Sequence, residues 1–184
     1  MNNILAFVGM PGSGKGTCTD YLENKGYPKI YFGGMVYEEV EARGLDIVKD
    51  EKMVREDMRA KEGMDVMAKR ASIKADDHFS NGKETVVFDG LYSWSEWKFL
   101  NEKYGKELVT IAVFTNKAER HRRFAARDDT NRKYTLEDAA RRDFEEIENI
   151  EKGGPISAAD YTLLNNGTPE DLIRSLDKLV NQII

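Results

Sequence analysis

The chain has 184 residues, of which 40% are hydrophobic and 33% charged, an ordinary balance for one globular domain with a well-solvated surface. The formal net charge of -5 argues against a general nucleic-acid binder, which normally carries a basic excess. A single cysteine, Cys18, excludes an intrachain disulfide, and with only two histidines the chain offers no set of ligands for a zinc cage.

The N-terminus carries no targeting signal, because Met1 leads into a short apolar run without a basic region or a cleavage site. The apolar runs also fall far short of the roughly 18 residues that a membrane-spanning helix needs. We therefore expect a cytoplasmic protein without membrane contacts, folded as one domain over residues 1–184.

Short apolar runs alternate with longer polar segments that have helical spacing. The runs are Ile4–Val8, Lys29–Phe32, Thr85–Phe88, Leu108–Phe114 and Tyr161–Leu164. Uninterrupted runs of this length suit strands that are buried on both faces. Strands that alternate with helices imply βαβ units, a parallel sheet and a doubly wound α/β fold.

Two further segments are expected to be helical. The stretch from about residue 33 to 80 has no strand signal, and we predict two or three helices that cap the sheet on the substrate side. The last helix should begin after Thr168, with Pro169 in its first position and one apolar face. That face consists of Leu172, Leu176, Leu179 and Ile183.

The first strand ends in a glycine-rich loop, Gly9-Met10-Pro11-Gly12-Ser13-Gly14-Lys15-Gly16-Thr17. Glycines let consecutive backbone N–H groups converge on phosphates, the following helix adds its dipole, and the Lys15 ammonium reaches the β- and γ-phosphates. A turn that merely contains glycines is the alternative. Strand, loop and helix follow in the required order, so we predict an ATP site. Its residues are Gly9, Pro11, Gly12, Ser13, Gly14, Lys15, Gly16 and Thr17.

The loop departs from the commonest form because Gly16, and not Ser or Thr, follows the lysine. The hydroxyl comes one place later, on Thr17. Mg²⁺ tolerates a coordination shell made of waters and phosphate oxygens. We therefore expect Mg²⁺ to be held through water, with Thr17 and Asp89 as the protein groups.

Asp89 ends the apolar strand that begins near Val86. Ligands of parallel sheets lie beyond the carboxyl ends of the strands, so Asp89 should face the same crevice as the glycine loop. There it would position Mg²⁺-bound water or accept a proton from the attacking oxygen of a substrate. The alternative is an aspartate that only starts a turn before Gly90.

Aromatic residues follow this strand, namely Tyr92, Trp94, Trp97 and Phe99. They either pack in the core or form a surface on which a substrate stacks.

Seven arginines lie between Arg120 and Arg142 in a chain whose net charge is negative. Arg123 and Arg127 are four residues apart, so they share a helix face and can reach one ligand. A guanidinium clamps phosphate oxygens or stacks on a base, and phosphoryl transfer needs cations around the migrating group. We assign both arginines to ATP and Arg127 also to catalysis. The alternative is a solvated helix whose arginines pair with neighbouring carboxylates.

Two connections are expected to border the crevice. The first is a short, polar lid at about residues 127–135, followed by a helix that starts at Thr135. The second is the loop Asn165–Thr168, where Gly167 would contact the adenine edge, although an ordinary strand–helix turn fits equally well.

Together these motifs resemble nucleoside monophosphate kinases and dephospho-CoA kinases. The likeness is carried by the GxPGxGKGT loop, Asp89-Gly90, Arg123 with Arg127, Arg141-Arg142, and the ending Ala159 to Thr168, and it extends over nearly the whole chain. The closest likeness is to an uncharacterised family of short P-loop kinases related to both. It implies a P-loop NTPase fold with three α/β/α layers and a five-stranded parallel sheet ordered 2-3-1-4-5. It also implies an acceptor-binding region around 33–80, with Arg123 beside the ATP base and Arg127 on its phosphates.

Two departures concern the acceptor side. Adenylate kinases carry an arginine in an STGDMLR pattern after the second strand, where this chain has Tyr31 to Tyr37. They carry another in a DGFPR pattern, where this chain has Asp89 to Ser93. The candidates that would bind an acceptor instead are Tyr37, Arg55, Arg59, Lys69, Arg70 and Arg142.

The sequence thus predicts an ATP- and Mg²⁺-dependent enzyme that passes the γ-phosphate to a small molecule, for which a nucleotide is the favoured acceptor. The alternative is a P-loop ATPase or nucleotide-binding switch, whose hydrolysis of ATP would not depend on any small acceptor.

Overall fold

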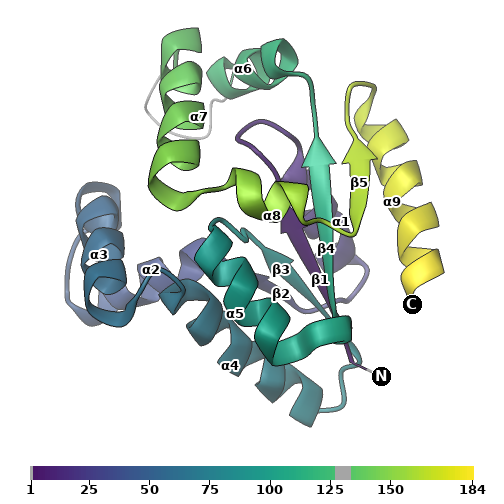
Figure 1. Cartoon of the computed structure of the whole chain (residues 1–184), viewed down its shortest axis with the longest axis horizontal. Helices are drawn as coiled ribbons and strands as arrows, with labels where there is room; N and C mark the ends of the chain where they lie inside the picture. The colour runs from purple at the N-terminus through teal and green to yellow at the C-terminus, as the bar shows by residue number, and fades with distance from the viewer. Residues whose placement is uncertain (1, 127–133) are drawn as a thin grey trace.

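The structure of the protein is a computed structural model that describes residues 2–126 and 134–184. Each strand is followed by one or more helices along the chain (Figure 1). Their bounds are β1 (Asn3–Val8), α1 (Lys15–Asn24), β2 (Lys29–Tyr31), α2 (Phe32–Ala42), α3 (Ile47–Glu62), α4 (Val66–Ser80), β3 (Thr85–Asp89), α5 (Trp94–Tyr104), the 3₁₀ turn η1 (Gly105–Glu107), β4 (Leu108–Phe114), α6 (Lys117–Ala125), α7 (Leu136–Ile150), α8 (Gly153–Ser157), β5 (Tyr161–Leu164) and α9 (Pro169–Ile183).

The five strands form one parallel sheet in the order β2-β3-β1-β4-β5. Both this order and the helices on its two sides confirm the predicted P-loop NTPase fold. The apolar runs located the strands to within one residue. The predicted run Lys29–Phe32 is one residue longer than β2, which ends at Tyr31, since Phe32 is the first residue of α2.

The central strand β1 is buried on both faces, since its side chains alternate between two cores. Ile4 and Ala6 belong to the core covered by α4 and α5, which lie in front of the sheet in Figure 1. Leu5 and Phe7 belong to the core covered by α1 and α9. The sheet is therefore the middle of three layers.

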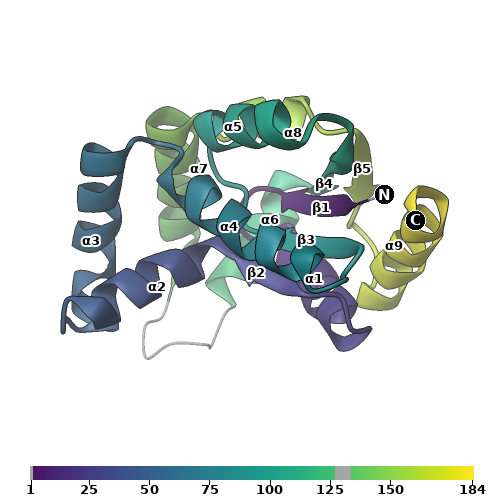
Figure 2. The same ribbon diagram turned by 90° about the horizontal axis from the view of Figure 1, so that it is seen from below.

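Three helices occupy the segment predicted to be helical between residues 33 and 80. Of these, α4 is a layer helix, because its small buried residues Ala68, Ala71 and Ala75 let it lie close to the sheet and α5. Helix α3 extends furthest from the sheet, at the end opposite α9 (Figure 2). The part of the region that projects beyond the sheet is thus α2 and α3.

The C-terminal helix α9 forms as predicted. The Thr168 hydroxyl accepts a hydrogen bond from the Asp171 N–H at 3.2 Å, and Pro169 stands at the start of the helix. Leu172, Leu176 and Leu179 are buried against the sheet. Among the described residues, no helix has both the length and the apolar character that crossing a membrane requires.

The carboxyl ends of the strands share one edge of the sheet because all five run in the same direction. The register places Asp89 beside Phe7 of β1 and beside Tyr31 of β2. Thr115 and Asn165 directly follow β4 and β5. The loop between β1 and α1 lies at this same edge, with the end of β3 and the residues that follow β4 and β5.

Candidate active site

The loop between β1 and α1 depends on two glycines with positive φ, Gly12 at 79° and Gly14 at 95°. A Cβ at Gly12 would lie 2.4 Å from the carbonyl oxygen of Arg120. A Cβ at Gly14 would lie 2.2 Å from Nδ2 of Asn165. Both the backbone conformation and the neighbours therefore require glycine at these positions.

Buried hydrogen bonds fix the backbone of this loop at Ser13. The side-chain amide of Asn165 donates to the Ser13 carbonyl at 2.8 Å. The Thr115 hydroxyl lies 3.0 Å from the same carbonyl and 3.0 Å from that of Asn165. The ends of β4 and β5 thus hold the loop in place, and Asn165 has a structural role that the sequence did not indicate.

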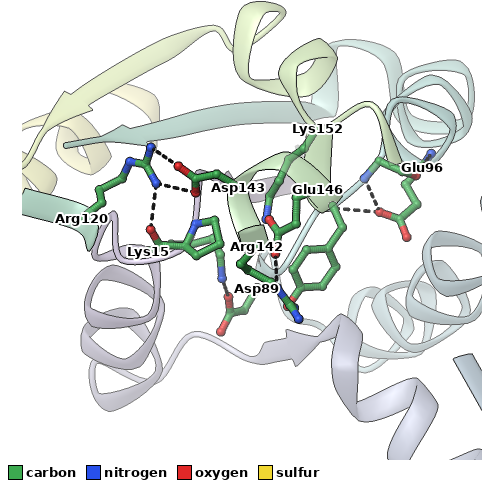
Figure 3. Close-up of polar contacts among 11 residues, drawn as sticks. Lys15, Asp89, Glu96, Arg120, Arg142, Asp143, Glu146 and Lys152 are labelled. Carbon is green, nitrogen blue, oxygen red and sulfur yellow. Dashed lines mark hydrogen bonds and ion pairs between the residues drawn. The ribbon is translucent and has the colours of Figure 1, made fainter. Parts of the chain in front are cut away.

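A buried arginine links the loop to the helices on either side of residues 127–133. Arg120 donates to both carboxylate oxygens of Asp143 at 2.8 Å and to the Pro11 carbonyl at 3.1 Å (Figure 3). His121 Nε2 lies 2.9 Å from the same carboxylate. Burial alone would raise the pKa of Asp143, but these two partners outweigh it and lower the pKa. Helix α6, the loop and α7 are therefore tied together.

This arginine is not one of those assigned from the sequence. Arg123 lies on α6 and donates from Nε to Glu119 at 2.7 Å, within its own helix. Arg127 and the lid up to residue 133 lie outside the described residues. The signal that points to Arg120 is its spacing of four residues from the buried Phe124, which puts both on the inner face of α6.

Lys15 and Asp89 are in direct contact. The ammonium of Lys15 lies 2.5 Å from Oδ1 of Asp89, and both side chains are largely buried. Thr17, in the first turn of α1, is exposed. One carboxylate and one accessible hydroxyl suit Mg²⁺ bound mainly by waters and phosphate oxygens. In the described part of the chain, no group of three or more His, Cys, Asp or Glu side chains is arranged to hold a metal by itself.

Tyrosines stand in the two segments in which the adenylate kinase patterns have arginines. The Tyr31 and Tyr37 rings meet edge to face, with centroids 6.1 Å apart. The Tyr92 hydroxyl next to Tyr31, together with burial, raises the pKa of Tyr31. The ammonium of Lys15 lies 5.9 Å from the centre of the Tyr92 ring. Tyr92 is thus the member of the aromatic group after β3 that reaches the lysine of the glycine loop.

The two tryptophans of that group are engaged elsewhere. Trp94 and Trp97 stack on each other at 4.7 Å, and Trp97 Nε1 donates to the Thr110 hydroxyl at 3.1 Å. Trp97 and Phe99 pack against the hydrophobic core, as the core interpretation expected.

The candidate acceptor-binding cations differ in their availability. Arg55 pairs with Glu51, Lys69 with Asp65, Arg70 with Glu39 and Glu62, and Arg142 with Glu146. Arg59 has no ion pair among the described residues, and its Nε is buried without a hydrogen-bond partner. Burial lowers the pKa of Arg59. Of these cations, Arg59 is therefore the best placed to take an anionic ligand.

We expect Gly14→Ala to destabilise the protein and to weaken ATP binding at least about tenfold. A left-handed alanine costs about 1–2 kcal/mol, and the contact with Asn165 adds to that. Gly153→Ala, at the start of α8 and outside the P-loop, is the matched control, because nothing lies within 4 Å of its added Cβ and alanine favours a helix by up to about 1 kcal/mol. Urea unfolding and titration with a fluorescent ATP analogue measure both effects. Equal behaviour of the two variants would contradict the described loop.

We expect Asp143→Asn to lower the free energy of unfolding at pH 7 by about 2–3 kcal/mol, the scale of hydrogen bonds to a charged group. Since the folded state lowers the pKa of Asp143, this contribution exists above about pH 4 and disappears as the pH falls through the folded pKa. The difference from the parent should therefore shrink in acid. Asp77→Asn, which changes an exposed aspartate with no ion pair among the described residues, should stay within about 0.5 kcal/mol. A difference that persists unchanged to pH 2 would show that the Asp143 charge is not responsible.

The sequence of the chain matches a known domain family and several related proteins. An AAA domain family matches residues 8–141 of the chain. A UPF0200 protein of Thermococcus kodakarensis is 34% identical and aligns over 98% of both chains. A UPF0200 protein of Thermococcus onnurineus is 32% identical over the same shares.

Solved structures share the fold at low sequence identity. TT1252 from Thermus thermophilus has a TM-score of 0.67 and 20% identity, covering 100% of this chain and 98% of that one. Shikimate kinase from Bacteroides thetaiotaomicron has a TM-score of 0.64 and 12% identity, covering 98% of both chains. These likenesses show a fold of the P-loop kinase type. The match of the AAA domain and the extent of the curated relatives place this chain in the UPF0200 family of P-loop proteins.

Proposed function

We propose that the protein is an ATP-dependent kinase that transfers the γ-phosphate to a small molecule, and we favour a nucleotide as the acceptor. The observation that carries the proposal is the contact between Lys15 of the P-loop and Asp89 at the end of β3. It brings a phosphate-binding cation and a candidate base to one point at the carboxyl edge of the sheet.

On the donor side, the P-loop residues Gly9 to Thr17 would bind the phosphates of ATP. Arg123 and Gly167 would lie beside the base, and Arg127 would contact the phosphates. Thr17 and Asp89 would hold Mg²⁺ through water. When bound, this ion would neutralise charge on the phosphate oxygens.

The proposed reaction begins when Lys15 exchanges its partner Asp89 for the phosphates of ATP. Without a nucleotide, Lys15 and Asp89 neutralise each other. A triphosphate offers the ammonium more negative charge, so Lys15 turns to it and leaves the Asp89 carboxylate available. The acceptor oxygen then forms a bond to the γ-phosphorus while the bond to the ADP oxygen breaks. A hydroxyl acceptor such as dephospho-CoA would pass its proton to Asp89. A nucleoside monophosphate, whose phosphate is already ionised near pH 7, would attack without losing a proton, and Asp89 would then serve only the Mg²⁺-bound water.

A nucleotide suits the acceptor side because it combines an anion with a flat ring. Arg59 lacks an ion pair among the described residues, and with Arg142 it would bind a phosphate. Tyr31 and Tyr37 present partly exposed rings on which a base can stack.

Arg55, Lys69 and Arg70 are paired with carboxylates of the segment from α2 to α4. Arg142 is paired as well, but its partner Glu146 also binds Lys152 beside Tyr92, so we give Arg142 the larger part in binding.

A small acceptor also agrees with the proteins that share the fold. One of them, the shikimate kinase of Acinetobacter baumannii, was solved in complex with shikimate. It has a TM-score of 0.58 and 18% identity to this chain, so it supports the class of reaction and not the identity of the acceptor.

The test is ADP release from ATP in the presence of AMP, CMP, GMP, UMP or dephospho-CoA. We expect one of these to raise the rate well above that with ATP alone. Asp89→Asn should lower the stimulated rate at least about 100-fold, the lower range for loss of a positioned base, with a smaller change in ATP affinity. Lys15→Ala should lose both binding and turnover.

The matched control for charge removal is Asp20→Asn, since Asp20 pairs with Lys29 on the surface of α1 and should leave the rate unchanged. Release of ADP at the same rate with and without every acceptor would favour the alternative, an ATPase or nucleotide switch.

A further inference from the structure

A lysine is buried next to the candidate site without having been assigned a role from the sequence. Lys152 precedes α8, and its side chain is only 2% exposed. Its ammonium forms an ion pair with Glu146 of α7, which is 8% exposed (Figure 3). Both charges are thus removed from water.

A buried ion pair of this kind contributes little to the stability of the fold. Moving two charges out of water is unfavourable, and a protein with apolar side chains of similar volume in their place is often as stable or more stable. Burial lowers the pKa of Lys152, and the Glu146 charge opposes this shift. For Glu146, burial would raise the pKa, but Lys152 and Arg142 outweigh it and lower the pKa. Burial thus disfavours both charges, while each partner favours the charged form of the other.

The neighbours of the pair show what it orients. Glu146 also accepts a hydrogen bond from Nε of Arg142 at 2.9 Å, so one carboxylate holds both cations. The Lys152 ammonium lies 4.7 Å from the centre of the Tyr92 ring, which Lys15 approaches to 5.9 Å. The pair therefore contacts two side chains on the acceptor side, Arg142 and Tyr92.

Tyr92 is held from its backbone as well. The buried Glu96 carboxylate accepts hydrogen bonds from the N–H groups of Tyr92 and Ser93, each at 2.8 Å (Figure 3). With its backbone fixed by Glu96, the Tyr92 ring is positioned further by the hydrophobic core, by Tyr31 and by the ammonium groups that approach it.

We propose that Lys152 and Glu146 are positioning residues for the phosphoryl acceptor, whose ion pair orients the Arg142 guanidinium and the Tyr92 ring beside Lys15. Neither residue contacts the acceptor itself. The inference rests on the proposed kinase function, because it concerns the acceptor half of that site.

The test is steady-state kinetics with the compound from the panel of AMP, CMP, GMP, UMP and dephospho-CoA that most stimulates ADP release. Lys152→Met and Glu146→Gln each remove one charge and keep the shape of the side chain. We expect kcat/KM for the acceptor to fall about 10- to 100-fold, the usual scale for residues that orient a contacting group. The KM for ATP should stay within about twofold, since the P-loop contacts are untouched.

The double variant Lys152→Met/Glu146→Gln should be no worse than either single variant, because the two residues act as one unit. It removes both charges of the buried pair together and leaves only the half-exposed Arg142 without its carboxylate, so it serves if a single variant fails to fold. Lys152→Arg keeps the positive charge and should retain more acceptor kcat/KM than Lys152→Met.

The matched control is Lys103→Met. Lys103 combines the same two contacts, an ion pair with Asp76 at 2.6 Å and a position 5.1 Å from the Tyr104 ring centre. It lies near the end of α5, close to the start of β4 and away from the P-loop. Its loss should alter stability and leave the acceptor constants unchanged.

Parent-like acceptor constants in Lys152→Met and in the double variant would overturn the inference and leave the kinase proposal standing. A rise in the KM for ATP as large as the loss in acceptor kcat/KM would also overturn it, since the pair would then serve the whole fold. If the parent shows no stimulation by any of these acceptors, the proposed function fails and the inference fails with it.

Discussion

The carbonyl group of Ser13 is the point on which the arrangement of the site depends. It accepts hydrogen bonds from Asn165 after β5 and lies within hydrogen-bond distance of Thr115 after β4. These buried contacts fix the P-loop backbone between Gly12 and Gly14, whose positive φ values only glycine adopts readily. With the loop fixed, α1 begins at Lys15. The ammonium group of Lys15 contacts Asp89 on the neighbouring strand β3. Because β1 and β3 are neighbouring parallel strands, the Lys15 ammonium and the Asp89 carboxylate lie at the same edge of the sheet.

Helix α7 connects this loop to the acceptor side. Asp143 and Glu146 are three residues apart and share its buried face. Asp143 holds Arg120 on the P-loop, and Glu146 holds Arg142 and Lys152 beside Tyr92. A single helix therefore supports both halves of the proposed transfer site.

Much of the fold was predictable because it depends on local apolar patterns. The runs Leu108–Phe114 and Tyr161–Leu164 coincide with β4 and β5, and Thr168 caps α9 as its sequence indicates. The fold resemblance also gave the correct strand order, which the registers confirm. The P-loop was recognisable because its backbone conformation requires glycine at fixed positions, and these glycines are visible in the sequence.

The buried charges were not predictable in the same way. Arg120 and Lys152 stand in polar segments that look solvated. Arg120 contacts the distant Pro11, and Lys152 contacts the distant Tyr92 ring in addition to Glu146, which is near it in the chain. Helix α7 even reverses the usual pattern, with Asp143 and Glu146 inside and Phe144 and Ile147 largely exposed. Periodicity assigns apolar residues to the inner face, so it misplaces a helix whose inner face is built from ion pairs.

The central claim is that phosphate moves from ATP to a small acceptor at the Lys15–Asp89 contact. Phosphorus NMR of the parent protein with ATP, Mg²⁺ and CMP, GMP or UMP in turn follows the transferred group directly. The account predicts that ADP and one nucleoside diphosphate accumulate in equal amounts, and that Asp89→Asn slows both together. Inorganic phosphate as the only product besides ADP, with every acceptor including AMP and dephospho-CoA left unmodified, would contradict it.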